Sequence, residues 1–363
     1  MAKIALVTDT HFGVRSDNQQ IAEHQGRFWR DVFFPYIDKH NIKYVRHLGD
    51  IVDRRKFVNY LTARNLRRMF IQPCIERGLD LGVIIGNHDV FFKNTNEVNA
   101  MTELYQDTLK AGFKWWSEPH EEEIDGTKIL LMPWINSGNY RECFAAMEET
   151  KAQIMMGHLE IAGFEMYRGS PSDHGFSKDL FSKFEIVMSG HFHHKSTNEN
   201  ISYLGSTYEM TWSDYDDPRG FHIFDTDTRE LTYIQNPNRI FHKLFYNDAD
   251  KVLTDILATP IDNLKDCYVK LIVLNKTNPY WFDMLVANIE KLGVIDLQVV
   301  EDHLGLDIED IDSMIDEAED TLTIMRKYAS AYLQDKNPEL AKELDALLTS
   351  LYQEALTTEE ASN

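Results

Sequence analysis

Short apolar runs recur along the first two thirds of the chain, and each run stops abruptly at polar residues. Continuous runs of Val, Ile, Leu and Met are typical of strands that are buried on both faces of a sheet. The predicted strands are Lys3–Thr8, Tyr44–Leu48, Leu81–Ile85, Ala152–Met156 and Ile186–Ser189. Helical patterns separate the first three strands, so the repeated unit is a strand, a polar loop and a helix. This alternation predicts an α/β fold.

Amphipathic stretches of helical period supply the predicted helices. Gln20–His40 contains Pro35, which is expected to kink or break the helix. Phe57–Arg77 is expected to end at Gly78, because glycine readily adopts the left-handed conformation that closes a helix. Shorter helices are predicted at Asn94–Ala111 and Tyr140–Thr150.

Turn signals and alternating residues predict further strands. Asp125-Gly126 suits a tight hairpin turn, which leads into a predicted strand at Ile129–Trp134. The pattern becomes rich in strands from Ile201 to Ile234, where Gly220–Asp225 is the clearest one.

The last third of the chain reads as two separate parts. A proline-containing linker precedes a small α+β module, and beyond Glu301 the sequence becomes acidic and helix-forming. The module's predicted elements are strands at Tyr268–Leu274 and Leu297–Val300 and a helix at Trp281–Leu292; the tail's are helices at Ile311–Leu333 and Pro338–Leu356. We therefore expect three parts, which comprise residues 1–238, 239–300 and 301–363.

The composition fits a globular protein whose cysteines are reduced. Of its 363 residues, 43% are hydrophobic, which is enough to fill a substantial core. Cys74, Cys143 and Cys267 lie far apart without a CxxC pair, so neither a disulfide framework nor a thiolate zinc site is indicated. Neither a signal-peptide pattern nor an apolar run of membrane-spanning length is present. We expect a cytoplasmic protein that does not associate with a membrane.

The net charge of -22 argues against a polyanionic substrate only at first sight. From Glu301 to the end there are 17 acidic residues against 4 basic ones, so more than half of the excess negative charge lies in the tail. A nucleic acid therefore remains a possible substrate for the first 300 residues.

Polar residues with metal-binding side chains follow five of the predicted strands. They are Asp9 and His11, Asp50 and Asp53, Asn87 and His88, His158, and His191 and His193. A single His after a Gly is more often an ordinary loop residue than a ligand. Five such sets at the carboxyl ends of strands, where α/β proteins bind their ligands, indicate one shared site.

Carboxylate, imidazole and amide groups together suit a pair of divalent cations. This mixed oxygen and nitrogen set fits Mn²⁺, Fe²⁺ or Zn²⁺ better than Ca²⁺. A two-metal site generates hydroxide from bound water and stabilises the attacking and leaving oxygens of a displacement at phosphorus. One carboxylate must bridge the metals, and Asp50, directly after Gly49, is the expected one.

The order of these motifs resembles the calcineurin-like metallophosphoesterase superfamily. The motifs are Asp9-x-His11, Gly49-Asp50-x-x-Asp53, Gly86-Asn87-His88-Asp89, Gly157-His158 and Gly190-His191-x-His193. The resemblance implies a four-layer α/β/β/α sandwich with a small α+β capping domain and C-terminal helices. It assigns Asp9, His11, Asp50 and His193 to one metal, and Asp50, Asn87, His158 and His191 to the other. It makes His88 the acid that protonates the leaving oxygen, with Asp53 orienting it, while Asp89 has no assigned role.

Within the superfamily, the surrounding residues favour a DNA nuclease. His191-x-His193, Tyr203-Leu204-Gly205-Ser206 and Arg219-Gly220-Phe221 resemble the SbcD-type nuclease subunit of double-strand-break repair complexes. In size and in its acidic tail the chain is similar to the recombination endonuclease subunits of T-even-type phages. The resemblance implies Mn²⁺ as the most suitable metal, with Mg²⁺, Fe²⁺ or Zn²⁺ as alternatives, DNA as the substrate, and the cytoplasm of the host cell if the chain is phage-encoded. It also implies an SMC-like ATPase of SbcC type bound through residues 301–363, and a homodimer within a heterotetramer, formed through Phe57–Arg77 and Asn94–Ala111.

Other interpretations stay open at this point. Arg54 follows the metal motif as in phosphoprotein phosphatases, so it either grips phosphate or is an ordinary loop arginine. The alternative enzyme is a phosphomonoesterase or phosphoprotein phosphatase, and the alternative from another class is a DNA-repair scaffold with a structural metal site. Trp115, Trp116 and Trp134 either stack on bases or belong to the core.

Overall fold

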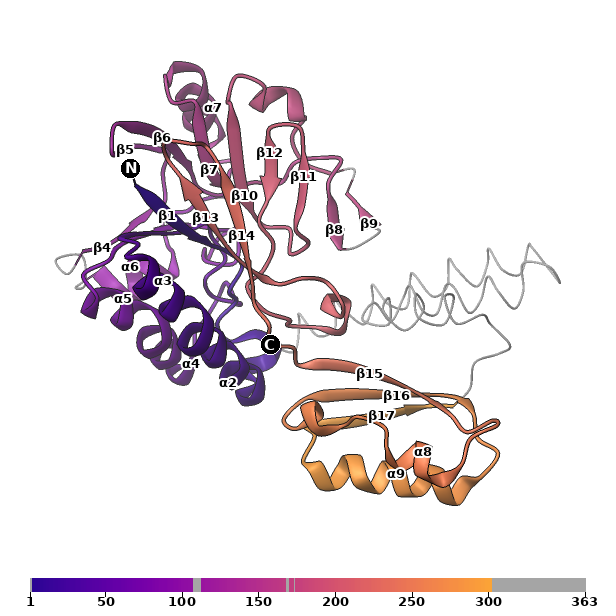
Figure 1. The fold of residues 1–363 in the computed structure, drawn as a ribbon. Helices are drawn as coiled ribbons and strands as arrows, with labels where there is room; N and C mark the ends of the chain where they lie inside the picture. The colour runs from indigo at the N-terminus through magenta and orange to yellow at the C-terminus, as the bar shows by residue number, and fades with distance from the viewer. Residues whose placement is uncertain (1, 107–111, 168–169, 173, 302–363) are drawn as a thin grey trace.

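Two six-stranded sheets lie face to face at the centre of the computed structural model, which describes residues 2–106, 112–167, 170–172 and 174–301 (Figure 1). The first sheet has the strand order β14-β13-β1-β2-β3-β4. Its strands are β1 (Lys3–Val7), β2 (Tyr44–His47), β3 (Asp80–Ile84), β4 (Phe113–Trp116), β13 (Gly220–Asp225) and β14 (Leu231–Gln235). Strands β1 to β4 run parallel, so their carboxyl ends share one edge of the sheet.

The second sheet has the strand order β11-β12-β10-β7-β6-β5. Its strands are β5 (His120–Ile124), β6 (Thr127–Met132), β7 (Ile154–His158), β10 (Ile186–Gly190), β11 (Ser196–Asn198) and β12 (Ile201–Tyr203). Strands β6, β7, β10 and β12 are parallel. The predicted hairpin joins β5 to β6, and Asp125 and Gly126 both have the positive φ that its tight turn requires.

Three apolar layers hold the sandwich together. The layer between the sheets contains residues of both, such as Leu6 and Ile84 from the first and Ile129 and Met156 from the second. Helices α3 (Phe34–His40), α4 (Tyr60–Leu66), α5 (Gln72–Glu76) and α6 (Ala100–Tyr105) cover the outer face of the first sheet. Helix α2 (Gln19–Arg27) packs through Ile21 against Tyr208 and Trp212. Helix α7 (Tyr140–Glu149) covers the outer face of the second. This is the four-layer α/β/β/α arrangement expected from the sequence.

Both proline-containing helices continue past their prolines through a wider turn. Proline lacks an N–H and its ring clashes with the carbonyl four residues earlier in an α-helix. A π-helical turn at Phe28–Phe33 precedes Pro35, and another at Arg67–Ile71 precedes Pro73. Each proline thereby falls in the first turn of the following α-helical segment. The expectation that Pro35 kinks or breaks its helix is met by this local change of helix type.

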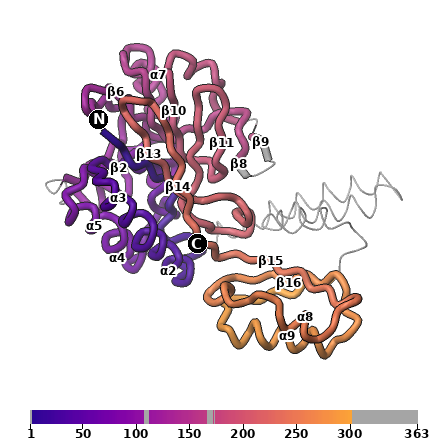
Figure 2. The backbone as a smooth tube through the Cα atoms, viewed as in Figure 1, coloured from indigo at the N-terminus to yellow at the C-terminus, as the bar shows by residue number. Residues whose placement is uncertain are grey.

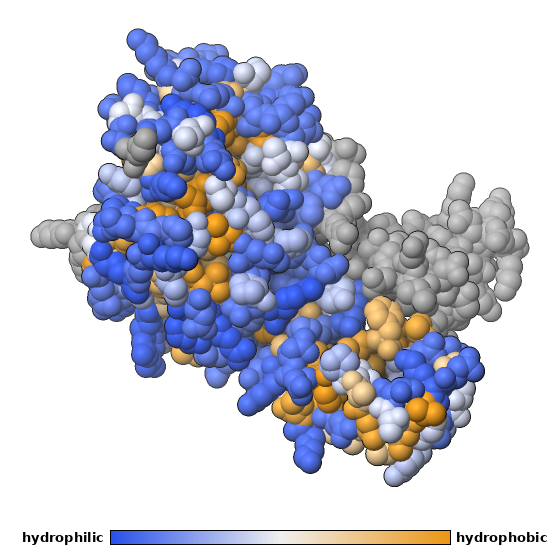
Figure 3. All heavy atoms as spheres, in the orientation of Figure 1, coloured by the Kyte–Doolittle hydropathy of each residue, from blue (hydrophilic) through white to orange (hydrophobic). Residues whose placement is uncertain are grey.

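A small α+β module follows the sandwich and lies apart from it in the backbone trace (Figure 2). Its sheet has the parallel order β15-β16-β17, and two helices pack on one face. The elements are β15 (Phe241–Asn247), α8 (Leu253–Leu257), β16 (Tyr268–Asn275), α9 (Pro279–Leu292) and β17 (Asp296–Val300). Hydrophobic atoms gather over this module in Figure 3, and its exposed apolar side chains include Phe245, Val252 and Leu257.

The module contacts the sandwich through an apolar cluster, which joins Ile21 and Trp212 of the sandwich with Phe241 of the module, and through polar contacts. The Asn18 side-chain amide donates to the Tyr268 hydroxyl at 3.1 Å, and the Lys270 ammonium lies 4.2 Å from the centre of the Trp212 ring. The division of the chain at residues 238 and 300 stays a prediction.

Some expected elements differ from the structure. Helix α6 begins at Ala100 rather than at Asn94, because residues 91–99 form a loop that is closed by a bridge between Val90 and Asn99. Strands β4 and β15 were not predicted. The two predicted tail helices lie outside the described residues. Among the helices that the structure describes, none has the length and apolar character needed to cross a membrane.

Candidate metal centre

The polar residues that follow five strands meet where the carboxyl ends of the two sheets come together. Strands β1, β2 and β3 bring Asp9, Asp50 and Asn87 from the first sheet, and β7 and β10 bring His158 and His191 from the second. A hydrogen bond joins the loops of the two sheets at this point, since the His191 main-chain N–H donates to both carboxylate oxygens of Asp9 at 3.1 Å. The predicted convergence is therefore present in the structure.

One cluster of donor atoms comes from Asp9, His11 and His193. Their candidate ligand atoms all lie within 4.8 Å of one another. The Nε2 atoms of His11 and His193 approach to 3.1 Å, and His11 Nε2 lies 3.8 Å from Asp50 Oδ2. Asp9, His11 and Asp50 are all buried.

A second cluster comes from Asp50, Asn87, His158 and His191. The candidate ligand atoms of Asp50, His158 and His191 also lie within 4.8 Å of one another. Asn87 Oδ1 lies 2.9 Å from His158 Nε2 and 3.0 Å from His191 Nδ1. The His158 Nδ1–H donates to the Leu48 carbonyl at 2.7 Å, which fixes the ring so that Nε2 faces the cluster.

The residues of the two clusters fit a pair of divalent cations. Nitrogen and oxygen lone pairs converge on two points, and Asp50 belongs to both because its Oδ2 lies 3.3 Å from His158 Nε2 and 3.8 Å from His11 Nε2. Several buried carboxylates crowded into one site repel one another, and a bound cation would offset that repulsion. This shared carboxylate is the position expected of a bridging ligand.

The charges of the cluster alter the pKa values of its histidines in opposite directions. Burial by itself would lower the pKa of His11 and of His158, but the neighbouring carboxylates outweigh it and raise both values to about 9. Burial, together with the His158 charge, lowers the pKa of His191 to about 3, and burial together with His11 keeps that of His193 well below its usual range. The carboxylates thus favour the charged forms of His11 and His158, whereas burial favours the neutral forms of His191 and His193.

His88 lies next to the first cluster, and its ring forms a third group of possible ligand atoms with His11 and Asp53, all within 4.8 Å of one another. Its Nδ1–H donates to the main-chain carbonyl of Asp53 at 2.6 Å, which leaves Nε2 as the ring atom available to a substrate. Its own N–H donates to Asp50 Oδ1 at 2.7 Å. The Asp53 carboxylate lies instead 3.4 Å from His11 Nδ1. His88 is therefore held by the main chain of Asp53, whereas the side chain of Asp53 supports His11.

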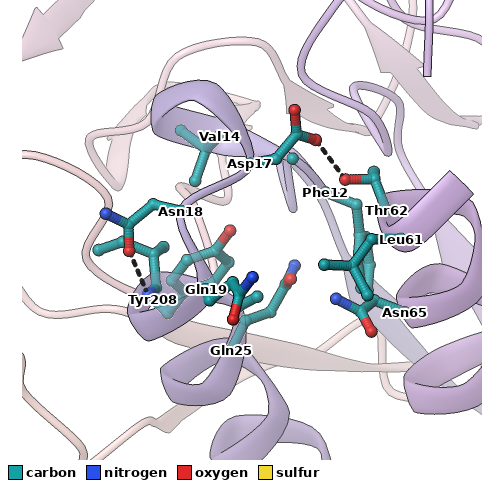
Figure 4. Close-up of a pocket in the computed structure, with 13 residues that line it drawn as sticks. Phe12, Val14, Asp17, Asn18, Gln19, Gln25, Leu61, Thr62, Asn65 and Tyr208 are labelled. Atoms are coloured by element: carbon teal, nitrogen blue, oxygen red, sulfur yellow. Dashed lines mark hydrogen bonds between the residues drawn. The ribbon is translucent and has the colours of Figure 1, made fainter. Parts of the chain in front are cut away.

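Arg54 is close to the site but already paired. Its guanidinium lies 3.0 Å from Asp17 Oδ2 and 4.9 Å from the centre of the Phe57 ring. Figure 4 shows Asp17 directed toward Thr62, whose hydroxyl donates to the same carboxylate side chain, at the rim of a narrow pocket that also includes Phe12. Asp17 thus restrains the one arginine that was considered as a phosphate ligand.

Two glycines are required by the close packing of the centre. A Cβ at Gly86 would lie 2.3 Å from both the N and the Oδ1 of Asp50, and one at Gly49 would lie 2.4 Å from His158 Nδ1. Gly49 also has a φ of +96°, which disfavours other residues. Any side chain at these positions would displace a candidate ligand.

Two residues that sequence reasoning did not assign support the centre from behind. The buried Asp89 carboxylate accepts the N–H groups of the loop that carries Asp50. Buried Arg219 donates to the His193 carbonyl, to Ser206 Oγ at 2.8 Å, and to Asp214 and Asp217 at 2.8 Å each. The Asp89 position beside Asn87 and His88 was a usable signal, whereas nothing in the spacing linked Arg219 to His193.

The three tryptophans have different positions. Trp115 and Trp116 lie on β4 and pack against the apolar layers, and Trp115 Nε1–H donates to Thr102 Oγ1 at 3.0 Å. Trp134 is half-buried, with its ring centre 5.1 Å from that of His191 and 6.0 Å from that of His158. Only Trp134 of the three therefore borders the candidate metal centre.

The sandwich carries two donor clusters that could hold a pair of cations, an arrangement that suits metal-assisted chemistry at phosphorus. Residues 2–195 match the calcineurin-like phosphoesterases, and the chain belongs to that family. The divalent-metal requirement of the family agrees with the donor groups described above.

Two relatives and one solved structure are similar to this chain. Exonuclease subunit 1 of Enterobacteria phage T4 is 32% identical over 72% of this chain and 78% of its own length. A subunit of the SbcCD nuclease of Staphylococcus saprophyticus subsp. saprophyticus is 30% identical over 41% of this chain and 37% of its own length. An archaeal phosphodiesterase of known structure is 14% identical and covers 64% of this chain and 99% of its own, with a TM-score of 0.32, and adds nothing to the assignment.

Proposed function

We propose that this protein is a metal-dependent DNA nuclease that hydrolyses phosphodiester bonds. The observation that carries the proposal is the pair of donor clusters joined by Asp50, since such an arrangement can hold two cations on either side of one phosphate. The similarity to a phage exonuclease subunit and to a subunit of the SbcCD nuclease supports DNA as the substrate.

The ligand assignment is part of this proposal. Asp9, His11, Asp50 and His193 would hold one ion, and Asp50, Asn87, His158 and His191 the other. The ions would supply an activated water and neutralise charge on the phosphate. We expect Mn²⁺ to serve best, because carboxylate, imidazole and amide ligands suit it, with Mg²⁺, Fe²⁺ or Zn²⁺ as alternatives.

The chain's own contribution to the reaction centres on His88. With Nδ1 donating to the Asp53 carbonyl, His88 would hold a proton on Nε2 and deliver it to the departing oxygen of the cleaved strand. Burial lowers the pKa of His88, which makes its protonated form a stronger acid. Asp53 would orient His88 through its main chain and keep His11 in place through its carboxylate.

The test is an assay on duplex DNA labelled separately at the 5′ and 3′ ends. The purified chain with Mn²⁺ is expected to release labelled products, with the label identifying the end at which cleavage begins. The same preparation is assayed on p-nitrophenyl phosphate. Efficient turnover of the monoester without cleavage of DNA would overturn the proposal.

Arg54 is the feature that favours a phosphomonoesterase as the second candidate. Its position after Asp53 suits a phosphate ligand once the Asp17 pair opens. An Arg54→Met variant that loses monoester hydrolysis but keeps DNA cleavage would support that activity as a separate one.

A scaffold with a structural metal site would leave no hydrolysis of either substrate in the metal-loaded protein.

We also propose that an SMC-like ATPase of SbcC type binds residues 301–363. The support is the acidic, amphipathic sequence after the small module and the word subunit in the names of both relatives. A chain that ends at Val300 should keep hydrolysis of a small phosphodiester and lose co-purification with the ATPase. Retained co-purification would contradict this assignment.

A homodimer within that complex is part of the proposal. Exposed apolar side chains gather at the start of α4, where Tyr60 is 96% exposed and Phe57 and Leu61 are also exposed. Phe91 and Phe92, which precede α6, are exposed as well. Tyr60→Glu together with Leu61→Glu should convert a dimer to a monomer in sedimentation analysis.

The three cysteines are free and buried, which fits the reducing cytoplasm in which such a complex would act.

A further inference from the structure

A cavity of about 280 Å³ opens beside the second donor cluster, and no proposed ligand or proton donor fills it. Its lining residues are Trp134, Ile135, His158, Leu159, Glu160, Gly175 and Phe176. Ile135 and Leu159 are buried and give it an apolar floor, while the rings of Trp134 and Phe176 are each half-buried. His158 connects the cavity directly to the metal centre.

The main chain of Trp134, whose side chain lines the cavity, is held by three hydrogen bonds. The Trp134 N–H donates to the Ile85 carbonyl at 2.8 Å, and the Trp134 carbonyl accepts from the side-chain amides of Asn96 at 2.9 Å and Asn139 at 3.0 Å. These three bonds fix the backbone just after β6. Trp134 is half-buried, so part of its side chain stays exposed next to the candidate metal centre. An aromatic side chain that served only to complete the core would be fully buried.

The opposite wall is fixed as well. Phe176 N–H donates to the Glu160 carbonyl at 2.8 Å, and Ala162 N–H donates to the Phe176 carbonyl at 3.0 Å. Gly175 allows this close approach, because a Cβ there would lie 2.4 Å from the Glu160 carbonyl oxygen. The Phe176 ring packs edge-on against Phe144 at 5.7 Å. Both aromatic walls are thus preformed.

The chemistry of the cavity indicates what it takes. Its walls are aromatic and apolar, and among the residues that the structure describes, the ionisable groups that line it are Glu160 and the candidate ligand His158. The carboxylate of Glu160 would repel a phosphate or a phosphorylated side chain. A flat, neutral ring can stack on Trp134 without such repulsion. A nucleobase attached to the phosphate in the metal centre meets both requirements.

We propose that this cavity receives one unstacked base of the DNA strand being cut, with Trp134 as the stacking partner. The base belongs to a nucleotide next to the scissile phosphate, and its capture places that phosphate between the two donor clusters. Trp134 acts as a residue for substrate positioning and does not take part in bond cleavage. This inference rests on the proposed nuclease function.

The test compares wild type with Trp134→Ala and Trp134→Phe on a series of oligonucleotides, each of which lacks one base near the cleavage position. In the wild type, one abasic position should lower kcat/KM by roughly five- to a hundredfold, the range expected for one lost stacking contact. Trp134→Ala should show the same loss on complete DNA and no further loss at that abasic position. Trp134→Phe should restore most of the difference.

Two controls separate the possible failures. Metal content and the unfolding midpoint of Trp134→Ala show whether the ring merely supports His191. A variant that loses the same factor on complete and abasic DNA would overturn the base-stacking role while leaving the nuclease function intact. Absence of cleavage of every oligonucleotide by the wild type would defeat the nuclease proposal itself.

Discussion

The carboxylate of Asp89 accepts the main-chain N–H of Asp50 at 2.9 Å. It thereby holds the main chain of the residue whose own carboxylate belongs to both clusters. The same side chain accepts from Gly86 at 2.8 Å, Ile51 at 2.9 Å and Val52 at 3.1 Å. Asp89 is buried and lies behind the metal centre rather than in it. It holds the loops that follow β2 and β3 in register.

Asp89→Asn should therefore damage the site without removing any ligand. The amide has one acceptor oxygen, and its NH₂ group would face main-chain donors that the carboxylate now accepts. We expect a loss of about 2 to 4 kcal/mol in the free energy of unfolding and weaker binding of both metals. Chemical denaturation and metal titration measure the two effects, with the exposed Asp296→Asn as the matched control. Unchanged metal affinity would show that the loop keeps its shape without these bonds.

His88→Ala should reduce DNA cleavage by about 10² to 10⁴ in kcat with metal content and stability unchanged. The defect should be much smaller on bis(p-nitrophenyl) phosphate, because nitrophenolate departs without needing a proton. Steady-state rates on the two substrates, together with metal analysis, give the comparison. An equal loss on both substrates would mean that His88 stabilises the transition-state charge rather than protonating the leaving group.

The convergence of the candidate site was predictable because it follows from chain geometry. Asp9, Asp50 and Asn87 each come directly after a buried parallel strand, and parallel strands deliver their carboxyl ends to one edge. The hairpin at Asp125-Gly126 was predictable for a similar reason, since its turn demands a local conformation that few residues adopt. In both cases short-range chemistry sets the outcome.

Other features depend on contacts between distant residues and could not be read from the chain. Arg219 reaches a carbonyl 26 residues away, so neither its spacing nor its type indicated that it supports His193. Strand β15 escaped prediction because its burial alternates only in part and its partner β16 comes later in the chain.

Arg219→Met should weaken one metal position more than the other. The change removes the donor to the His193 carbonyl and takes the guanidinium away from the buried carboxylates of Asp214 and Asp217. We expect a destabilisation of about 3 to 5 kcal/mol and a fall in metal stoichiometry from two ions toward one. Native mass spectrometry at saturating Mn²⁺ measures the stoichiometry, and the exposed Arg30→Met serves as control. Simultaneous loss of both ions at equal concentrations would contradict a selective role at His193.

His222 should make the protein less stable in mild acid. Burial lowers its pKa from an ordinary 6.5 to about 3, with Lys195 adding to the effect. The unfolded chain therefore binds a proton below about pH 6.5 that the folded chain refuses until about pH 3, and stability is lost as the pH falls through that window. This one group should contribute a slope of about 1.4 kcal/mol per pH unit. The free energy of unfolding in urea is measured at about pH 6 and about pH 5, which both lie inside that window. His222→Leu should remove this group's part of the slope, whereas the exposed His174→Leu should leave it in place. An unchanged slope in His222→Leu would show that His222 is accessible to protons in the folded state.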